Sequence, residues 1–171
     1  MNTRHFPHFD ETTAPAAARE RLAATRTAFG AIPAPVAAYA GAPLMLATAL
    51  SGLDAFEKTS LSPLEREVLA MTMGRVNGCQ FCLALHRCLL TMREAPASLV
   101  EALEQGLPLE EPRLEALRRF ILGMLATRGD VDAEIWDGFL GAGYTRQQAL
   151  EVVLGIGVYT LTTFSNRLVE V

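Results

Sequence analysis

Two cysteines and a histidine occur at a spacing that suits thiol chemistry. Cys79, Cys82 and His86 lie in the segment CQFCLALH at positions i, i+3 and i+7. On an α-helix these positions project from one stripe, so the three side chains can meet. The free N–H groups and the positive dipole end at a helix start stabilise a thiolate, and a nearby imidazole can accept the thiol proton. The pattern therefore indicates a cysteine that reacts at neutral pH.

The Cys-x-x-Cys spacing meets a second chemical requirement. Two sulfurs one helical turn apart can close a disulfide after one has been oxidised to a sulfenic acid, which makes the oxidation reversible. One alternative is a structural zinc site, but the chain offers few further ligands: His86 nearby, and His5 and His8 near the N-terminus. Another alternative is two reduced cysteines packed in the core. We favour redox chemistry and expect neither a metal nor a cofactor.

An upstream carboxylate is the fourth candidate. Glu67 shares a predicted helical face with Ala70 and Gly74, while its sequence neighbours point elsewhere. A carboxylate on an apolar and buried face needs a reason to be there. Asn77 and Gly78 predict a turn that folds this helix back against the next one. Glu67 would then face the cysteines and relay a proton through water.

The stretch EVLAMTMGRVNGCQFCLALH resembles the alkylhydroperoxidase AhpD-like branch of the carboxymuconolactone decarboxylase superfamily. The hallmark of that branch is a glutamate, eleven residues, a Cys-x-x-Cys pair, three residues and a histidine, and residues 67 to 86 reproduce it without a gap. The likeness extends upstream through FGAIPAPVAAYAGAPLML, as in the peroxidase-related members, and more loosely to the C-terminus. The better-studied peroxidases carry a histidine where this chain has Phe81. The decarboxylase members lack the cysteine pair, so only their fold is carried over.

This resemblance implies an all-α, AhpD-like helical bundle that assembles as trimers or hexamers. It also implies a thiol-dependent peroxidase of the alkyl hydroperoxide reductase type. By analogy, Cys82 attacks the peroxide and becomes the sulfenic acid, Cys79 is the proton donor and resolving thiol, and His86 with Glu67 forms the relay. The expected partners are a hydroperoxide substrate, a dithiol or protein thiol reductant, and further copies of the chain. Two alternatives stay open: a disulfide reductase acting as adaptor for a partner peroxidase, and a non-catalytic redox-sensing oligomer.

The elements that must position these residues are helices. Apolar residues recur at three-to-four spacing and strand signals are weak, which predicts an all-α fold. Ser62, Pro63 and Glu65 form a capping-box pattern that opens a helix ending at Val76, and the next helix begins beside Cys79. Further helices are expected at about residues 15–29, 36–39, 43–56, 112–128 and 135–140, with one more ending at Gly106 and a last one starting at Thr145.

Composition limits the class of protein. Half of the 171 residues are hydrophobic, which is enough to bury a core without metal or disulfide staples. We expect one domain of residues 1–171, with residues 1–13 as an extended or wrapping N-terminal arm. The net charge of −4 and the scattered arginines argue against binding to nucleic acid. No GxGxxG or P-loop motif indicates a nucleotide cofactor.

Two uncharged stretches raise the question of membrane insertion. Pro33, Pro35 and Pro43 interrupt the first, Thr27–Leu53, so we expect two short helices in a core or at a subunit contact. The second, Val152–Ser165, is too short to span a bilayer and predicts a buried core helix. The N-terminus shows no signal-peptide pattern, and three cysteines do not fit a secreted disulfide framework. We therefore expect a cytoplasmic protein without membrane contact.

Four further residues are interpreted as core residues. Cys88 lies on a different stripe of its helix from the cysteine pair, together with Leu85 and Met92, and this apolar company favours a packing role. Aromatic residues at helical spacing usually fill cores as well, so no function is assigned to Trp136, Tyr144 and Tyr159.

Overall fold

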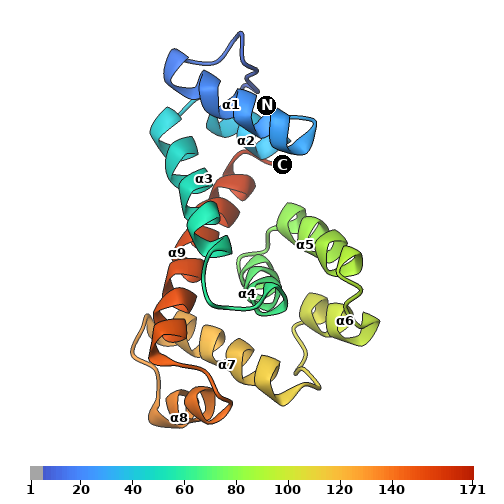
Figure 1. The fold of residues 1–171 in the computed structure, drawn as a ribbon, viewed down its shortest axis with the longest axis vertical. Helices are drawn as coiled ribbons and strands as arrows, with labels where there is room; N and C mark the ends of the chain where they lie inside the picture. The colour runs from blue at the N-terminus through green and yellow to red at the C-terminus, as the bar shows by residue number, and fades with distance from the viewer. Residues whose placement is uncertain (1–5) are drawn as a thin grey trace.

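The structure, a computed structural model, describes residues 6–171, and within them it contains nine α-helices and no strand (Figure 1). The all-α prediction is confirmed. The helices are α1 (Ala16–Phe29), α2 (Ala34–Tyr39), α3 (Pro43–Glu57), α4 (Pro63–Val76), α5 (Gln80–Met92), α6 (Ala97–Gln105), α7 (Pro112–Thr127), α8 (Ala133–Gly141) and α9 (Arg146–Leu168).

Short-range capping sets the helix boundaries close to where the sequence predicts them. At the start of α4 the capping box is complete, because the Ser62 hydroxyl accepts from the Glu65 N–H and the Glu65 carboxylate accepts from the Ser62 N–H. Thr145 and Gln148 form the same reciprocal pair at the start of α9. Gly30 ends α1 with a φ of 76°, a left-handed conformation that glycine adopts at little cost.

Helix α4 lies in the middle of the fold and contacts α5, α6, α7 and α9 (Figure 1). Every residue from Glu67 to Gly74 is buried, so this helix is enclosed rather than amphipathic. The core around it includes Phe56, Leu117 and Phe120, all essentially inaccessible to solvent. A polar side chain on α4 must therefore find its partners inside the protein.

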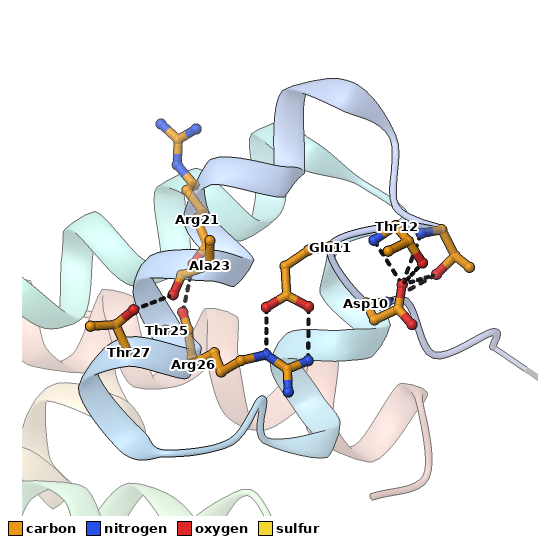
Figure 2. A network of polar contacts seen from close by, with 9 residues as sticks. Asp10, Glu11, Thr12, Arg21, Ala23, Thr25, Arg26 and Thr27 are labelled. Atoms are coloured by element: carbon orange, nitrogen blue, oxygen red, sulfur yellow. Dashed lines mark hydrogen bonds and ion pairs between the residues drawn. The ribbon is translucent and has the colours of Figure 1, made fainter.

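A second cluster of buried side chains joins α1, α2 and α3, and the segment before α1 lies against it. The Phe9 N–H donates to the Ala37 carbonyl at 3.1 Å, and the Phe9 ring packs against this cluster. Figure 2 shows Glu11 paired with Arg26 of α1 through hydrogen bonds of 2.5 and 2.8 Å. Hydrogen bonds from the two following threonines hold the pKa of Asp10 far below its usual range. The first five residues of the expected arm, His5 among them, lie outside the described residues.

The prediction that the uncharged run in α9 is a buried core helix is wrong for one of its faces. The inner face packs against α3 and α4, and Val152, Gly155 and Tyr159 are buried there. The outer face is open: Val153 is 46% exposed and Phe164 is 57% exposed. The absence of charge marked an apolar helix, but apolar residues on both faces do not say which face is covered. In the part of the chain that the structure describes, no helix combines the length and apolar character needed to cross a bilayer.

The prediction that Cys88 is a core residue is also wrong. Cys88 is exposed on the outer face of α5, where Leu85 is 44% and Met92 is 79% exposed. The apolar stripe was recognised correctly, but α4 and α6 contact the other side of α5. Cys88 is therefore an accessible free thiol.

Candidate active site

The turn between α4 and α5 places Cys79 at the start of a helix. Asn77 closes α4 in a right-handed conformation, and Gly78 follows with a φ of 65°, which reverses the chain. The Cys79 N–H donates back to the Gly74 carbonyl at 2.9 Å. Cys79 is the N-cap of α5, and its sulfur accepts the backbone N–H of Cys82 at 3.3 Å. The sulfur thus takes the place of the usual capping oxygen, where a negative charge is stabilised.

The two cysteines are buried and joined. Cys79 and Cys82 form a disulfide between Cα atoms 5.3 Å apart, and the residues are 1% and 4% exposed. Gly74 of α4 lies directly against them, since a Cβ at that position would stand 3.4 Å from the Cys82 Cβ and from Leu83. A larger side chain there would push α5 away from α4. The small residue on the Glu67 face therefore allows the close approach of the two helices.

The structure brings Glu67 and His86 together. The His86 Nδ1 lies 2.8 Å from the Glu67 Oε2, and both residues are buried between α4 and α5. The other carboxylate oxygen lies 3.6 Å from the Nε of Arg93, a partly exposed residue at the end of α5. A neutral ring that donates from Nδ1 to the carboxylate has Nε2 as its acceptor. His86 is on the stripe of Cys82, one helical turn further along α5.

Tyr159 of α9 covers the histidine. Its ring lies 5.4 Å from the His86 ring in an edge-to-face arrangement, and 5.8 Å from the Phe56 ring on the other side. Burial raises the pKa of Tyr159 well above its usual range, and the negative charge of Glu67 adds to that rise. The phenol therefore stays neutral beside the imidazole. Sequence reasoning assigned Tyr159 to core packing alone, whereas its ring also packs against the ring of His86.

Asn166 of α9 contacts both sulfurs and was not a sequence-based candidate. Its side-chain nitrogen lies 3.3 Å from the Cys82 sulfur and 3.8 Å from the Cys79 sulfur. Its side-chain oxygen meets the hydroxyl of Tyr39, which also lies 3.1 Å from the Thr162 carbonyl. A signal was present in the sequence: α9 carries a polar stripe at helical spacing on an otherwise apolar helix, consisting of Tyr159, Thr162, Thr163 and Asn166.

The model of the carboxymuconolactone decarboxylase family matches residues 45–123, which include the whole of α4 and α5. The resemblance predicted from Glu67, the cysteine pair and His86 is therefore confirmed.

Two solved structures share the AhpD-like fold. One is described as an alkylhydroperoxidase AhpD core, an uncharacterized peroxidase-related protein from Ralstonia eutropha JMP134; the TM-score is 0.81 at 18% identity, over 95% of this chain and 88% of that one. The other is an uncharacterized peroxidase-related protein from Silicibacter sp. TM1040, with a TM-score of 0.74 at 19% identity, over 90% and 82%. At these identities the likeness shows the fold. No curated protein matches the chain.

In this AhpD-like bundle, two further contacts fix α9 against the cysteine turn. The Asn77 side chain donates to the Thr163 hydroxyl at 2.9 Å, and Arg167 donates to the Asn77 carbonyl at 2.9 Å. Neither of these contacts reaches a sulfur. They join the last turns of α9 to the end of α4.

The sequence raised a structural zinc site as an alternative interpretation of the cysteine pair. Among residues 6–171, no three His, Cys, Asp or Glu side chains are grouped so that they could hold a metal ion. The acidic and imidazole groups beside the cysteines are instead paired with one another. The chemistry that this arrangement can support is thiol oxidation with movement of a proton between Cys82, His86 and Glu67.

Proposed function

We propose that the chain is a thiol-dependent peroxidase that reduces hydroperoxides through Cys82 and Cys79. The observation that carries the proposal is the buried Glu67 and His86 pair, 2.8 Å apart, on the same side of α5 as the cysteines. A purely structural disulfide has no need of a paired acid and base beside it. The AhpD-like fold and the match to the carboxymuconolactone decarboxylase family support the same class of reaction.

In the first step the reduced Cys82 attacks the peroxide. His86 accepts the thiol proton, and Glu67 stabilises the imidazolium that forms. The thiolate then bonds to one peroxide oxygen while the O–O bond breaks. The leaving alkoxide takes the proton from His86 and departs as an alcohol. Cys82 is oxidised by two electrons to a sulfenic acid, and the peroxide is reduced.

In the second step Cys79 resolves the sulfenic acid. Its sulfur attacks the Cys82 sulfur, the S–S bond forms, the S–O bond breaks and water leaves with the Cys79 proton. The product is the disulfide found in the structure. An external dithiol or protein thiol then supplies two electrons and two protons to restore both thiols. The backbone N–H of Cys82, which donates to the Cys79 sulfur, stabilises the Cys79 thiolate in this exchange.

Three observations support Cys82 rather than Cys79 as the attacking sulfur. Cys82 is one helical turn before His86, whereas Cys79 is two turns away. The Asn166 amide lies nearer to Cys82, at 3.3 Å against 3.8 Å. Cys82 is also the less enclosed of the two.

The predicted self-association and cytoplasmic location stay predictions. The open face of α9, where Leu150, Leu154 and Phe164 are exposed, supports self-association because a monomer rarely leaves so apolar a face uncovered. Sedimentation of the purified chain would measure the number of copies.

The test of the proposed function is peroxide consumption with a dithiol reductant. Wild type, Cys82→Ser and Cys79→Ser are compared after circular dichroism has shown equal folding. We expect turnover in the wild type alone, and a dimedone-trapped sulfenic acid on Cys82 in the Cys79→Ser protein. A serine at position 79 keeps the capping acceptor, so the fold of α5 is preserved. Turnover by Cys82→Ser, or a trapped sulfenic acid on Cys79 in that variant, would remove Cys82 from the assigned role.

A further inference from the structure

The amide of Asn166 has a defined orientation because of its neighbour on α2. Asn166 is buried, and a buried amide is costly unless its polar atoms are paired. The Tyr39 hydroxyl meets the amide oxygen. Burial raises the pKa of Tyr39 well above its usual range, so this hydroxyl keeps its hydrogen at any pH at which a cysteine ionises. The hydroxyl lies against two acceptors, the amide oxygen and the Thr162 carbonyl, and because the amide oxygen is turned toward this donor, the amide nitrogen lies toward the two sulfurs.

We propose that Asn166 is a catalytic hydrogen-bond donor to the Cys82 thiolate, and that Tyr39 is the positioning residue that aims its amide. The inference deepens the proposed function and rests on it for the reaction with peroxide. The stabilisation of the thiolate is separate from that reaction, and it is measurable without any peroxide. Asn166 touches the reacting sulfur, whereas Tyr39 acts only through Asn166.

The amide favours one state of the sulfur over the others. A hydrogen bond is stronger when its acceptor is charged, so the N–H groups stabilise a thiolate more than a thiol or a disulfide. The amide therefore makes Cys82 more acidic and makes the disulfide easier to reduce. A charge-assisted hydrogen bond of ordinary strength corresponds to a shift of about 1 unit in the pKa of the thiol. At a pH above the pKa of Cys82, where the reduced form is the thiolate, the equivalent change in the thiol–disulfide equilibrium is roughly tenfold.

Cys82 is best studied as the sole cysteine. In a Cys79→Ser, Cys88→Ser background, the rate of iodoacetamide alkylation against pH reports the ionisation of Cys82 alone. Four variants are made in this background: Asn166→Ala, Asn166→Asp, Tyr39→Phe and Thr163→Val. The last is the matched control, because it removes a part-buried hydrogen bond of the same helix that reaches neither sulfur. The nearly isosteric aspartate keeps the side-chain volume if the alanine variant folds poorly.

We expect the thiol pKa to rise by about 1 unit in Asn166→Ala. It should rise further in Asn166→Asp, because a carboxylate would then face the thiolate. Tyr39→Phe should give a smaller rise, since the amide remains but loses its fixed orientation. Thr163→Val should leave the pKa within about 0.3 units of the background. Unchanged values in both Asn166 variants, or an equal rise in Thr163→Val, would overturn the inference.

A second measurement uses the chain with all its cysteines. In glutathione redox buffers at a pH above the thiol pKa of both proteins, Asn166→Ala should shift the equilibrium about tenfold toward the disulfide, because the thiolate has lost the donor. The absence of a shift would contradict the inference. If the wild type consumes no peroxide while both shifts appear, the proposed function fails and the role of Asn166 in stabilising the thiolate stands.

Discussion

Helix α5 carries a cysteine on each of two apolar faces, and the two cysteines have opposite surroundings. On the inner face, Cys82 is buried against α4, lies one turn from His86 and is touched by Asn166. On the outer face, Cys88 is exposed beside Met92. The two stripes have similar sequence character. The comparison shows that the surroundings of a cysteine depend on which neighbouring helices cover it, since α4 supplies the carboxylate and α9 the amide, while the imidazole comes from α5 itself.

The largest expected difference between the two faces of α5 is in peroxide turnover, and it comes from substitutions at two adjacent residues. His86→Ala removes the inner imidazole and should lower peroxide turnover by roughly 100-fold, the usual contribution of a positioned acid–base group. Arg87→Ala is the outer control, because the Arg87 side chain pairs with Glu104 at 3.3 Å on the open side of α5. Turnover at saturating dithiol is measured for both. Equal rates in the two variants would deny His86 its part in the relay.

The faces of α9 allow the same comparison in terms of stability. A Cβ on Gly155 would stand 2.6 Å from Phe56 and 2.7 Å from Leu69, so Gly155→Ala should cost about 1–3 kcal/mol. Gly157 has no atom within 4 Å of the corresponding Cβ, and Gly157→Ala should be neutral or add about 0.5–1 kcal/mol through helix propensity. Urea unfolding of each variant measures the difference. A small loss of unfolding free energy in Gly155→Ala would mean that the side chains near Phe56 move to make room for the added methyl group.

Two glutamates of α4, both buried, separate catalysis from stability. Glu67→Gln keeps the shape but removes the charge opposite His86, and should slow turnover about tenfold. Glu65→Gln should leave turnover unchanged, because Glu65 binds Ser62 and Arg113 at the start of the helix. Peroxide assays on the two glutamines test the distinction, and a slow Glu65→Gln with normal folding would contradict it.

Glu65 also predicts a dependence of stability on pH. Burial alone would raise the pKa of Glu65, but hydrogen bonds from Ser62, Tyr144 and Arg113 outweigh it and hold that pKa below its usual range. A carboxyl with a lowered folded-state pKa stabilises the protein above its unfolded pKa, and this stabilisation is lost as the pH falls through the folded value. Urea titrations between neutral and acidic pH should therefore show a flatter acid limb for Glu65→Gln. Parallel curves would assign the acid sensitivity to other groups.

The smallest expected effect concerns Cys88 itself. Cys88→Ser on an open surface should change the free energy of unfolding by less than about 0.5 kcal/mol and leave turnover unaltered. Titration with a thiol reagent should find one accessible thiol per oxidised native chain, and none in the variant. A Cys88 thiol that does not react with the reagent would indicate that a second copy of the chain covers this face of α5.

Local sequence patterns predicted the helices and much of the site. The capping boxes at Ser62 and Thr145 and the glycine after α1 are short-range signals, and each lies where the structure uses it. The spacing from Glu67 to His86 covers one helical hairpin, so the juxtaposition of these residues followed from a single turn. The family resemblance then supplied roles that the pattern alone left open.

Contacts between distant segments could not be predicted in this way. Asn166 meets Cys82 across 84 positions of sequence, and Tyr39 meets Asn166 across 127. Such contacts depend on how α9 crosses α4, which is a property of packing rather than of local pattern. The errors on Cys88 and on the outer face of α9 have the same origin. Each stripe was recognised as apolar, but its burial depends on which other helix packs against it.

The sulfur cap of α5 has a consequence for how a large reductant reaches a disulfide that is almost wholly enclosed. Sulfur is a weaker acceptor than the hydroxyl oxygens that cap α4 and α9, so the first turn of α5 should open more readily than theirs. Native-state hydrogen exchange would reveal this as early deuterium uptake at the amides of residues 80–83. Transient fraying of that turn would give a partner thiol its path to the buried bond while the rest of the bundle stays folded.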